Sequence, residues 1–238
     1  LRDLSKVSDI GVVTGSDYDY FMQQCKFMFD MSGIPVTSVQ IFPCNGTKHY
    51  TWKGNGFKKV YDADMMTLIG TEKYRSLLIS VMTMQAEILK NYDLPFTGIF
   101  FHYRGSMLNW CPIGRLAERE ERAAWVEADK KNKIRERYMT QIQSSIQSLD
   151  VNLDVAMGGS TSFDIYPKGW DKTYVMRHVE KYDIVNFMGD KCRPGGNDHT
   201  LYQLLSESEV HESFEVKSPK ETIELINTRI LNKGNKDG

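Results

Sequence analysis

The stretch from Ile184 to Asp198 contains two carboxylates in a pattern that is suited to binding a metal ion. Its apolar start predicts a buried parallel strand that ends at Asp190. The glycine pair Gly195-Gly196 permits a tight loop that returns Asp198 towards Asp190. Two acidic groups at the carboxyl end of a parallel strand suit Mg²⁺, which prefers oxygen ligands and keeps several waters. An ordinary turn with two solvated aspartates explains the stretch equally well, so both interpretations stay open.

A group of arginines is suited to binding a phosphate. Arg115, Arg119 and Arg122 share one helical face if a helix begins at once, and Arg104 lies on the predicted hairpin before them. Each guanidinium group can donate two charge-assisted hydrogen bonds, so converging arginines bind a phosphate well. The spacing alone favours the alternative, a solvated helix face on which the arginines pair with the neighbouring glutamates.

Lys172 is a further candidate, because it stands where a helix over residues 173–179 is predicted to begin. A cation at that end opposes the helix dipole and costs about 0.3–1 kcal/mol when it is exposed. A bound anion nearby would remove that cost. The alternative is a loop lysine in solvent.

Thr14 follows a short β-branched run, Ile10–Val13, and precedes a helical pattern that starts at Tyr18. A strand, a small polar turn and a helix form the α/β unit, whose turn offers backbone N–H groups to an anion. The Thr14 hydroxyl could add a further donor there. The alternative is that the turn only caps the helix, for which Ser16 and Asp17 are suitable.

The elements predicted around these residues change in character along the chain. Residues 41–52 contain two short strands around an Asn45-Gly46 turn, and residues 64–92 form an amphipathic helix. The segment after it is mainly antiparallel, with a hairpin at Arg104-Gly105 and a charged helix over 116–149 that is interrupted near Asp129. This pattern predicts an α+β module inserted into an α/β domain. The predicted domains are residues 1–66 and 169–238 for the α/β core and residues 67–168 for the module.

Composition excludes several classes of protein. The chain has 238 residues with 30 basic and 31 acidic side chains, so its net charge of −1 does not attract nucleic acid or an anionic membrane. Its 4 cysteines are scattered without a C-x-x-C motif, which predicts free thiols in a reducing compartment. No signal peptide and no membrane-spanning apolar run is evident. We therefore expect a cytoplasmic protein without nucleic-acid or membrane partners.

Seven motifs, which occur in one order between about Ser8 and His199, together resemble a known family. They read G-V-V-T-G-S-D, F-P-C-N-G, Y-R-G-S-M-L-N, C-P-I-G-R-x-x-x-x-E-E-R, G-G-S-T-S-F-D-I-Y-P-K-G-W-D-K, M-R-H-V-E and G-D-K-C-R-P-G-G-N-D-H. With these motifs in register, the chain is similar to the eukaryotic-type phosphomannomutases of the haloacid dehalogenase-like superfamily.

The resemblance implies an α/β fold, with a haloacid dehalogenase-like parallel-sheet core and an inserted α+β cap domain that contains a mainly antiparallel sheet. It implies the interconversion of mannose 6-phosphate and mannose 1-phosphate, which feeds GDP-mannose synthesis. That reaction passes through an aspartyl-phosphate and a hexose 1,6-bisphosphate, which is also the activator. The core would hold Mg²⁺ and the transferring phosphoryl group. The cap would hold the other phosphate of the phosphorylated hexose and mediate a homodimer.

The resemblance also implies a role for each candidate residue. Asp190 would be the Mg²⁺ ligand, with Asp198 supporting the metal site. Lys172 would neutralise charge on the aspartyl-phosphate, and Thr14 would hydrogen-bond the phosphoryl oxygens. The residues implied to clamp the distal phosphate are Arg104, Arg115 and Arg122, with Ser162 and Asp164 also contacting the ligand. Arg119 has no counterpart role.

The chain departs from the family pattern in two places. The D-x-D-G-T motif, which carries the nucleophile and the general acid/base, does not occur in the 238 residues. The local candidates, Asp17 with Asp19 and Asp62 with Asp64, are not followed by Gly-Thr. The sequence after His199 lacks the acidic ligands of a second cation site, so we do not expect that site.

The first residues, Leu1 to Lys6, read as a helix already under way, so we expect a preceding segment that carries the missing motif. In the family, the strand of that motif lies mid-sheet, between the strands that end at Thr14 and Asp190. Without a carboxylate nucleophile we expect this chain by itself to be inactive. Two alternatives stay open: a sugar-phosphate phosphatase of the same superfamily, and a catalytically inactive protein that binds a ligand or dimerises.

Overall fold

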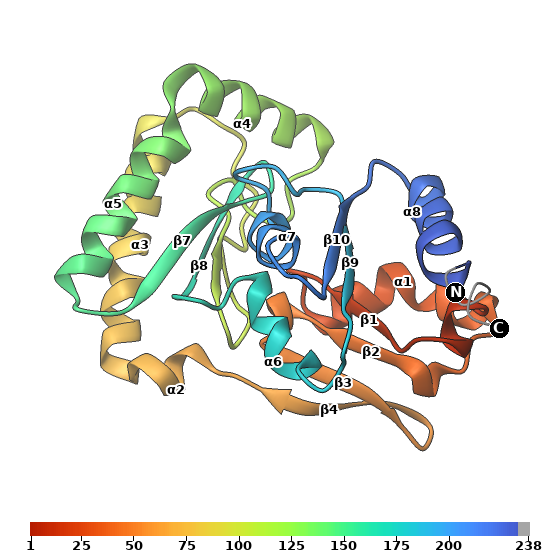
Figure 1. The fold of residues 1–238 in the computed structure, drawn as a ribbon. Coiled ribbons are helices and arrows are strands. Elements are labelled where there is room, and N and C mark those ends of the chain that lie inside the picture. The colour runs from red at the N-terminus through yellow and green to blue at the C-terminus, as the bar shows by residue number, and fades with distance from the viewer. Residues whose placement is uncertain (233–238) are drawn as a thin grey trace. The chain divides into compact units, whose positions relative to one another are not determined.

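The computed structural model describes residues 1–232, which form two compact units (Figure 1). One unit consists of Leu1–Asp62 together with the chain from Gly169 onward, and the other of Ala63–Lys168. The first boundary between the units lies between Asp62 and Ala63, a few residues before the predicted boundary between residues 66 and 67. Residues 233–238, which end the predicted core, lie outside the described residues.

The first unit contains a four-stranded sheet in which the first two strands are parallel and the others antiparallel. Its strands are β1 (Ile10–Val13), β2 (Val39–Phe42), β3 (Lys48–Lys53) and β4 (Gly56–Asp62), in that order. Helix α1 (Tyr18–Ser32) connects β1 to β2, and its Phe21 and Phe29 share a buried core cluster with Val39. The predicted Asn45-Gly46 turn between two strands is confirmed, whereas β4 was not predicted.

A second sheet of this unit has two parallel strands, β9 (Asn186–Gly189) and β10 (Glu212–Glu215), with α7 (His199–Ser206) between them in the chain. The predicted parallel strand before Asp190 is therefore confirmed. The prediction that it is buried is wrong, because only Gly189 of β9 is buried. The physical reason is that β9 pairs on one side only.

Open strand edges are a feature of this unit. Within the described residues, β1 pairs only with β2, and β9 pairs only with β10. Val13 of β1 and Phe187 of β9 nevertheless pack against the same buried cluster, which contains Phe42 and Leu201.

The other elements of the unit are η1 (Leu4–Lys6), η2 (Val36–Ser38), η3 (Cys44–Gly46), η4 (Lys172–Val175), α6 (Met176–Val179), α8 (Pro219–Leu225) and the π-helical η5 (Ile226–Leu231).

The second unit contains an antiparallel sheet with strand order β5-β6-β8-β7. The elements of this unit are α2 (Met65–Ile69), α3 (Thr71–Asn91), β5 (Phe101–Tyr103), β6 (Leu108–Trp110), α4 (Arg119–Asn132), α5 (Ile134–Ser148), β7 (Leu153–Gly158) and β8 (Ser162–Pro167). Helices α3 and α5 run side by side, and α5 packs against β7 (Figure 1). Alternate strand residues are apolar and buried, among them Trp110, Phe163 and Ile165. Because side chains alternate along a strand, the residues between them form a second, polar face.

Two predicted helices are each divided in two, and both breaks lie at residues with positive φ. Gly70, with φ of 86°, separates α2 from α3 within the predicted helix 64–92. The charged helix breaks at Lys133, with φ of 51°, and not near Asp129 as predicted. Asp129 instead accepts a hydrogen bond from the backbone N–H of Arg135 at 2.7 Å, which stabilises the start of α5. No helix within residues 1–232 is both long and apolar enough to cross a membrane.

Two histidines lie in an aromatic cluster of the first unit. The Phe42 ring is stacked on His49 and on His178, with centroid distances of 4.6 and 5.5 Å. His49 Nε2 lies 3.0 Å from Gln40 Oε1, and His178 Nε2 lies 2.8 Å from the Gly46 carbonyl oxygen, so each ring donates from Nε2. Burial, together with nearby positive charge, lowers the pKa of His49 to about 4, and burial also lowers the pKa of His178.

We predict that the first unit loses stability as the pH falls from 6.5 to about 4. In this window the imidazole of His49 gains a proton in the unfolded chain but not in the folded one, so acid favours unfolding. The variant His49→Phe keeps a ring next to Phe42 and removes this titration. Its urea unfolding midpoint should therefore fall less between pH 7 and pH 5 than that of the wild type.

The control is His211→Asn, whose Oδ1 can still accept from the Val185 N–H as His211 Nδ1 does. This variant should keep the pH dependence of the wild type. An equal loss of stability in His49→Phe and in the wild type would contradict the prediction.

Candidate active site

The turn after β1 carries Thr14, whose Oγ1 accepts a hydrogen bond from the Ser16 N–H at 3.1 Å. The Asp17 carboxylate accepts from the first turn of α1 at 2.9 Å, so the prediction that Asp17 caps this helix is confirmed. Residues of η3 bind the same turn, because Asn45 N donates to Thr14 O and Cys44 N donates to Ser16 O. The turn is thereby held in place, and the O–H of Thr14 keeps its capacity to donate.

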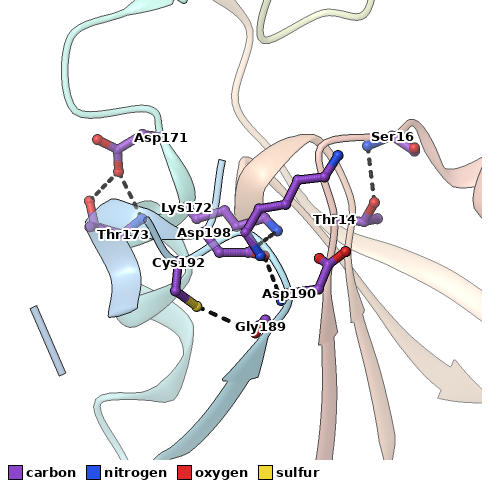
Figure 2. A network of polar contacts seen from close by, with 10 residues as sticks. Thr14, Ser16, Asp171, Lys172, Thr173, Gly189, Asp190, Cys192 and Asp198 are labelled. Carbon is purple, nitrogen blue, oxygen red and sulfur yellow. Dashed lines mark hydrogen bonds and ion pairs between the residues drawn. The ribbon is translucent and has the colours of Figure 1, made fainter. Parts of the chain in front are cut away.

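A buried ion pair joins Lys172 to Asp198 (Figure 2). Only 8% of the Lys172 side chain and 4% of the Asp198 side chain are exposed. Lys172 Nζ donates to Asp198 Oδ1, and the backbone N–H groups of Asp190 and Lys191 donate to Oδ2 at 3.1 and 3.0 Å. The alternatives of a loop lysine in solvent and of a solvated Asp198 are therefore wrong.

The predicted helix after Lys172 begins as the 3₁₀ turn η4 and becomes α-helical only at Met176. Asp171 caps this turn, since its Oδ1 accepts from Thr173 N at 2.8 Å and from Thr173 Oγ1 at 2.6 Å (Figure 2). The cap directs the Lys172 side chain to the inside of the unit, where the Asp198 carboxylate compensates its charge.

Electrostatics keep the Asp198 carboxylate ionised. Burial by itself would raise the pKa of this group, but the hydrogen bond and charge of Lys172, with the Lys191 N–H, lower it below its ordinary value. Burial and the Asp198 charge raise the pKa of the nearby Cys192 thiol to about 11. Cys192 therefore stays a thiol, which donates to the Gly189 carbonyl oxygen at 3.4 Å (Figure 2), and it is not a nucleophile at neutral pH.

The loop between Asp190 and Asp198 is closed by its own backbone. Asp198 N donates to Lys191 O at 3.2 Å, and Gly196 N donates to Arg193 O at 2.8 Å. A Cβ atom on Gly196 would stand 2.0 Å from Lys191 O, so only glycine fits. The prediction that this glycine pair permits the return of the chain to Asp190 is confirmed.

Asp190 is exposed at the end of β9, and in Figure 2 its carboxylate points in the direction of Thr14. Asp198 binds Lys172 and two N–H groups, so it supports the loop that presents Asp190. Within residues 1–232, no three His, Cys, Asp or Glu side chains are grouped so that they could hold a metal ion. Mg²⁺ is commonly held by one or two carboxylates with waters and phosphate oxygens, so Asp190 suits one ligand position of such a site.

The candidate residues of the second unit gather on the polar face of its sheet. The strand register pairs His102 of β5 with Asn109 of β6, and Asn109 with Asp164 of β8. Paired residues point to the same face, and Ser162 shares that face because it lies two positions before Asp164. Asn109 is buried, and its Nδ2 donates to Asp164 Oδ1 at 2.7 Å. This bond orients the carboxylate of Asp164.

Arg104 and Arg115 meet at His102. Arg104 Nε lies 3.4 Å from His102 Nδ1, and Arg115 Nη1 contacts the same nitrogen. Helix α4 begins only at Arg119, so Arg115 lies in the loop before it and the predicted common helical face is wrong. The two guanidinium groups converge because the hairpin and the loop bring them to one imidazole.

Arg122 lies in the first turn of α4 and folds back over the loop that carries Arg115. Its Nη2 donates to Arg115 O at 3.0 Å, its Nε to Ala117 O at 2.8 Å, and its Nη1 to Thr161 Oγ1 at 3.0 Å. These bonds use three of the five N–H donors of a guanidinium group and leave two for a ligand. Arg122 therefore fixes the backbone of Arg115.

Two of the glutamates near the arginines bind the backbone of α4. Glu118 and Glu121 form a capping box, in which Glu118 N donates to Glu121 Oε2 at 2.6 Å. Glu118 and Glu121 therefore bind the helix backbone, and the alternative in which the glutamates pair with the arginines does not hold for these two residues. Arg119 is exposed at the first position of α4.

Sequence reasoning did not identify His102 or Asn109 as part of this group. The signal that could have found them is strand alternation: His102 and Arg104 are two positions apart on one side of the predicted hairpin, so both point to one face. Asn109 lies on the returning strand, opposite His102 in the register.

Comparison with known proteins decides the family. A sequence model described as eukaryotic phosphomannomutase matches residues 1–233. The chain belongs to this family. The phosphomannomutase of Nicotiana benthamiana is 33% identical over 99% of this chain and 86% of its own length. That of Drosophila melanogaster is 34% identical over 93% of this chain and 82% of its own length. The family predicted from the seven motifs is therefore confirmed.

Solved structures confirm the predicted haloacid dehalogenase-like fold class. Plasmodium falciparum IMP-nucleotidase matches 97% of this chain and 57% of its own, with a TM-score of 0.61 and 12% identity. A trehalose-6-phosphate phosphatase related protein matches 99% of this chain and 86% of its own, with a TM-score of 0.52 and 16% identity. At such low identity the similarity is one of fold alone.

In this phosphomannomutase family member, we predict that Lys172→Met lowers the free energy of unfolding by roughly 3–5 kcal/mol at pH 7, because it leaves a buried carboxylate without its cation. The pKa of Asp198 is lowered in the folded chain. The stability from the pair is therefore present above about pH 3.9 and is lost as the pH falls through the lowered value. Urea unfolding at pH 7 and near pH 3 should show the variant approaching the wild type in acid.

Lys220→Met is the control, because Lys220 is 87% exposed in its pair with Glu224. This variant should unfold at nearly the wild-type urea concentration. A Lys172→Met variant as stable at pH 7 as the control would contradict the predicted role of the pair.

Proposed function

We propose that this chain, together with a strand that carries D-x-D-G-T, catalyses the phosphomannomutase reaction, which interconverts mannose 6-phosphate and mannose 1-phosphate and feeds GDP-mannose synthesis. The observation that carries the proposal is that each unit has its own set of groups suited to a phosphate. A reaction through a hexose 1,6-bisphosphate, which also serves as activator, has to hold two phosphates on one sugar. A sugar-phosphate phosphatase needs one phosphate subsite, so the second set favours the mutase.

We take the first unit as the core domain, where the transferring phosphoryl group binds. Lys172 neutralises charge on the aspartyl-phosphate, and its ammonium group has two N–H donors beyond the one that binds Asp198. Thr14 donates its hydroxyl to a phosphoryl oxygen. Mg²⁺, when bound, supplies positive charge to the phosphoryl oxygens, and Asp190 is the carboxylate that would hold it while Asp198 supports the loop.

We take the second unit as the cap domain, where the distal phosphate binds. Arg104 and Arg115 supply two convergent guanidinium groups, and Arg122 keeps two N–H donors next to them. Ser162 and Asp164 contact the ligand from the polar face of the sheet. The support for these roles is that Ser162 and Asp164 lie on the polar face, Arg104 and Arg115 meet at His102 of that face, and Arg122 binds the loop that carries Arg115.

The covalent step needs a carboxylate nucleophile, and D-x-D-G-T does not occur in the 238 residues. We propose that the strand carrying this motif pairs with the open edges of β1 and β9. A parallel strand there would end at the same side as Thr14 and Asp190, where the ligands of parallel sheets bind. The nucleophile would thus stand between the Thr14 hydroxyl and the carboxylate that holds Mg²⁺.

We also propose that the protein is a cytoplasmic homodimer that associates through the second unit. Its four cysteines are free thiols, as in proteins of a reducing compartment. Helix α3 exposes Ile79, Met82 and Leu89, which are 59%, 53% and 44% exposed. With Ala86 they follow the 3-4-3 spacing of a coiled-coil seam, which suits an identical helix of a second copy.

We predict mutase turnover from this chain when a strand with D-x-D-G-T precedes it, and none from the 238 residues alone. Both proteins are incubated with mannose 1-phosphate, Mg²⁺ and glucose 1,6-bisphosphate, and mannose 6-phosphate and free phosphate are measured. Mannose 6-phosphate should be the main product, because the second phosphate subsite retains the bisphosphate.

The matched control carries Asn in place of the first Asp of the added motif, and it should be inactive. Free phosphate as the main product would favour the phosphatase. Absence of both products from the extended chain would contradict an enzyme of either kind.

We predict that the double variant Ile79→Glu, Met82→Glu is a monomer, because it places two carboxylates in the apolar seam of α3. Light scattering after size-exclusion chromatography should give about half the wild-type mass. Glu87→Lys, a charge reversal at an exposed position of α3 outside the seam, should leave the mass unchanged. A wild-type protein that is already monomeric at micromolar concentration would refute the proposed dimer.

A further inference from the structure

His102 occupies the point at which two predicted phosphate ligands converge. It lies at the middle of β5, and its Nδ1 contacts both Arg104 Nε, at 3.4 Å, and Arg115 Nη1. A guanidinium group carries donors only and stays protonated, so the histidine nitrogen is the acceptor in both contacts. A neutral imidazole has one acceptor nitrogen, so these contacts assign the lone pair to Nδ1 and the proton to Nε2.

The two guanidinium groups repel each other, and on flexible side chains they would separate without a group between them. The neutral imidazole accepts from both groups, which holds them together, and it carries no negative charge that would cancel theirs. Holding ligating groups in the bound arrangement before the ligand arrives improves affinity, because less conformational freedom is lost on binding.

The position of His102 is itself fixed by the sheet. β5 pairs with β6 through His102 and Asn109, and β6 pairs with β8 through Asn109 and Asp164. The buried Asn109 binds the Asp164 carboxylate at 2.7 Å. One row across three strands thus carries an acceptor for the arginines, a buried amide and an oriented carboxylate, all on the polar face.

We propose that His102 is a positioning residue of the phosphate subsite: its neutral imidazole holds the Arg104 and Arg115 guanidinium groups in the convergent arrangement that a phosphate dianion requires. The inference rests on the proposed function, because it assigns a phosphate to these arginines. His102 acts through the two arginines and does not itself contact the transferred group.

The test measures binding of mannose 6-phosphate to the 238-residue chain by titration calorimetry. His102→Phe keeps a ring and removes the acceptor, and it should weaken binding about tenfold, as expected when a hydrogen bond to a charged group is lost. His102→Asn places an amide oxygen where Nδ1 stands and should bind within about threefold of the wild type. His102→Gln places that oxygen one bond further out and should behave as His102→Phe does.

Arg104→Gln removes one charge and should weaken binding at least as much as His102→Phe. Thermal unfolding of each variant shows whether it is folded. If His102→Phe does not fold, the comparison of His102→Asn with His102→Gln, which are both polar, still tests the inference. The positioning role would be overturned if His102→Gln bound mannose 6-phosphate as tightly as the wild type does. It would also be overturned if His102→Asn bound no more tightly than His102→Gln. If Arg104→Gln loses binding while His102→Phe and His102→Gln keep it, only this inference fails. If the wild type does not bind mannose 6-phosphate, the proposed function fails as well.

Discussion

The buried pair of Lys172 and Asp198 is the interaction on which the first unit's candidate site depends. Two charges are removed from water there. Each compensates the other, and two backbone N–H groups also donate to the carboxylate. Removing either partner would leave an uncompensated charge in the interior, which is far more costly than the loss of an exposed pair. The pair therefore joins the 3₁₀ turn at Lys172 to the loop after β9, although these segments are distant in the sequence.

This pair also separates the roles of the two aspartates. Asp198 accepts three hydrogen bonds from the protein and is buried, so it holds the loop, whereas Asp190 remains exposed at the end of β9. Gly196 permits the loop to close, because any side chain there would collide with the Lys191 carbonyl oxygen. The buried Asp198 thus holds the loop that presents the exposed carboxylate of Asp190 to a metal ion.

The antiparallel sheet of the second unit divides stability and binding between its two faces. Trp110 and Phe163 are stacked at 4.9 Å on the apolar face, where helices cover them. The polar face carries the groups suited to a ligand. Structures with 12% and 16% identity share the fold, and fold alone does not decide the reaction. The side chains of the polar face therefore carry the argument for a second phosphate subsite.

The amino-acid sequence by itself determined the features that depend on neighbouring residues. The strand, turn and helix around Thr14, the glycine loop before Asp198 and the hairpin at Arg104-Gly105 follow from backbone preferences over a few positions. Seven motifs in register were sufficient for the family. The register of β3 with β4 and the breaks at Gly70 and Lys133 depend on packing, so periodicity alone did not place them.

Only the tertiary structure decided which chemical groups meet. Lys172 is buried because Asp198 returns to it, which no local pattern around Lys172 indicates. Arg115 lies outside α4, which begins only at Arg119, and Arg122 binds its carbonyl oxygen from the first turn of that helix. His102 joins both arginines because the sheet and the loop bring two segments, the hairpin with Arg104 and the loop with Arg115, to one nitrogen. Local preferences extend over one turn or one strand, whereas these contacts connect segments that only the folded chain brings together.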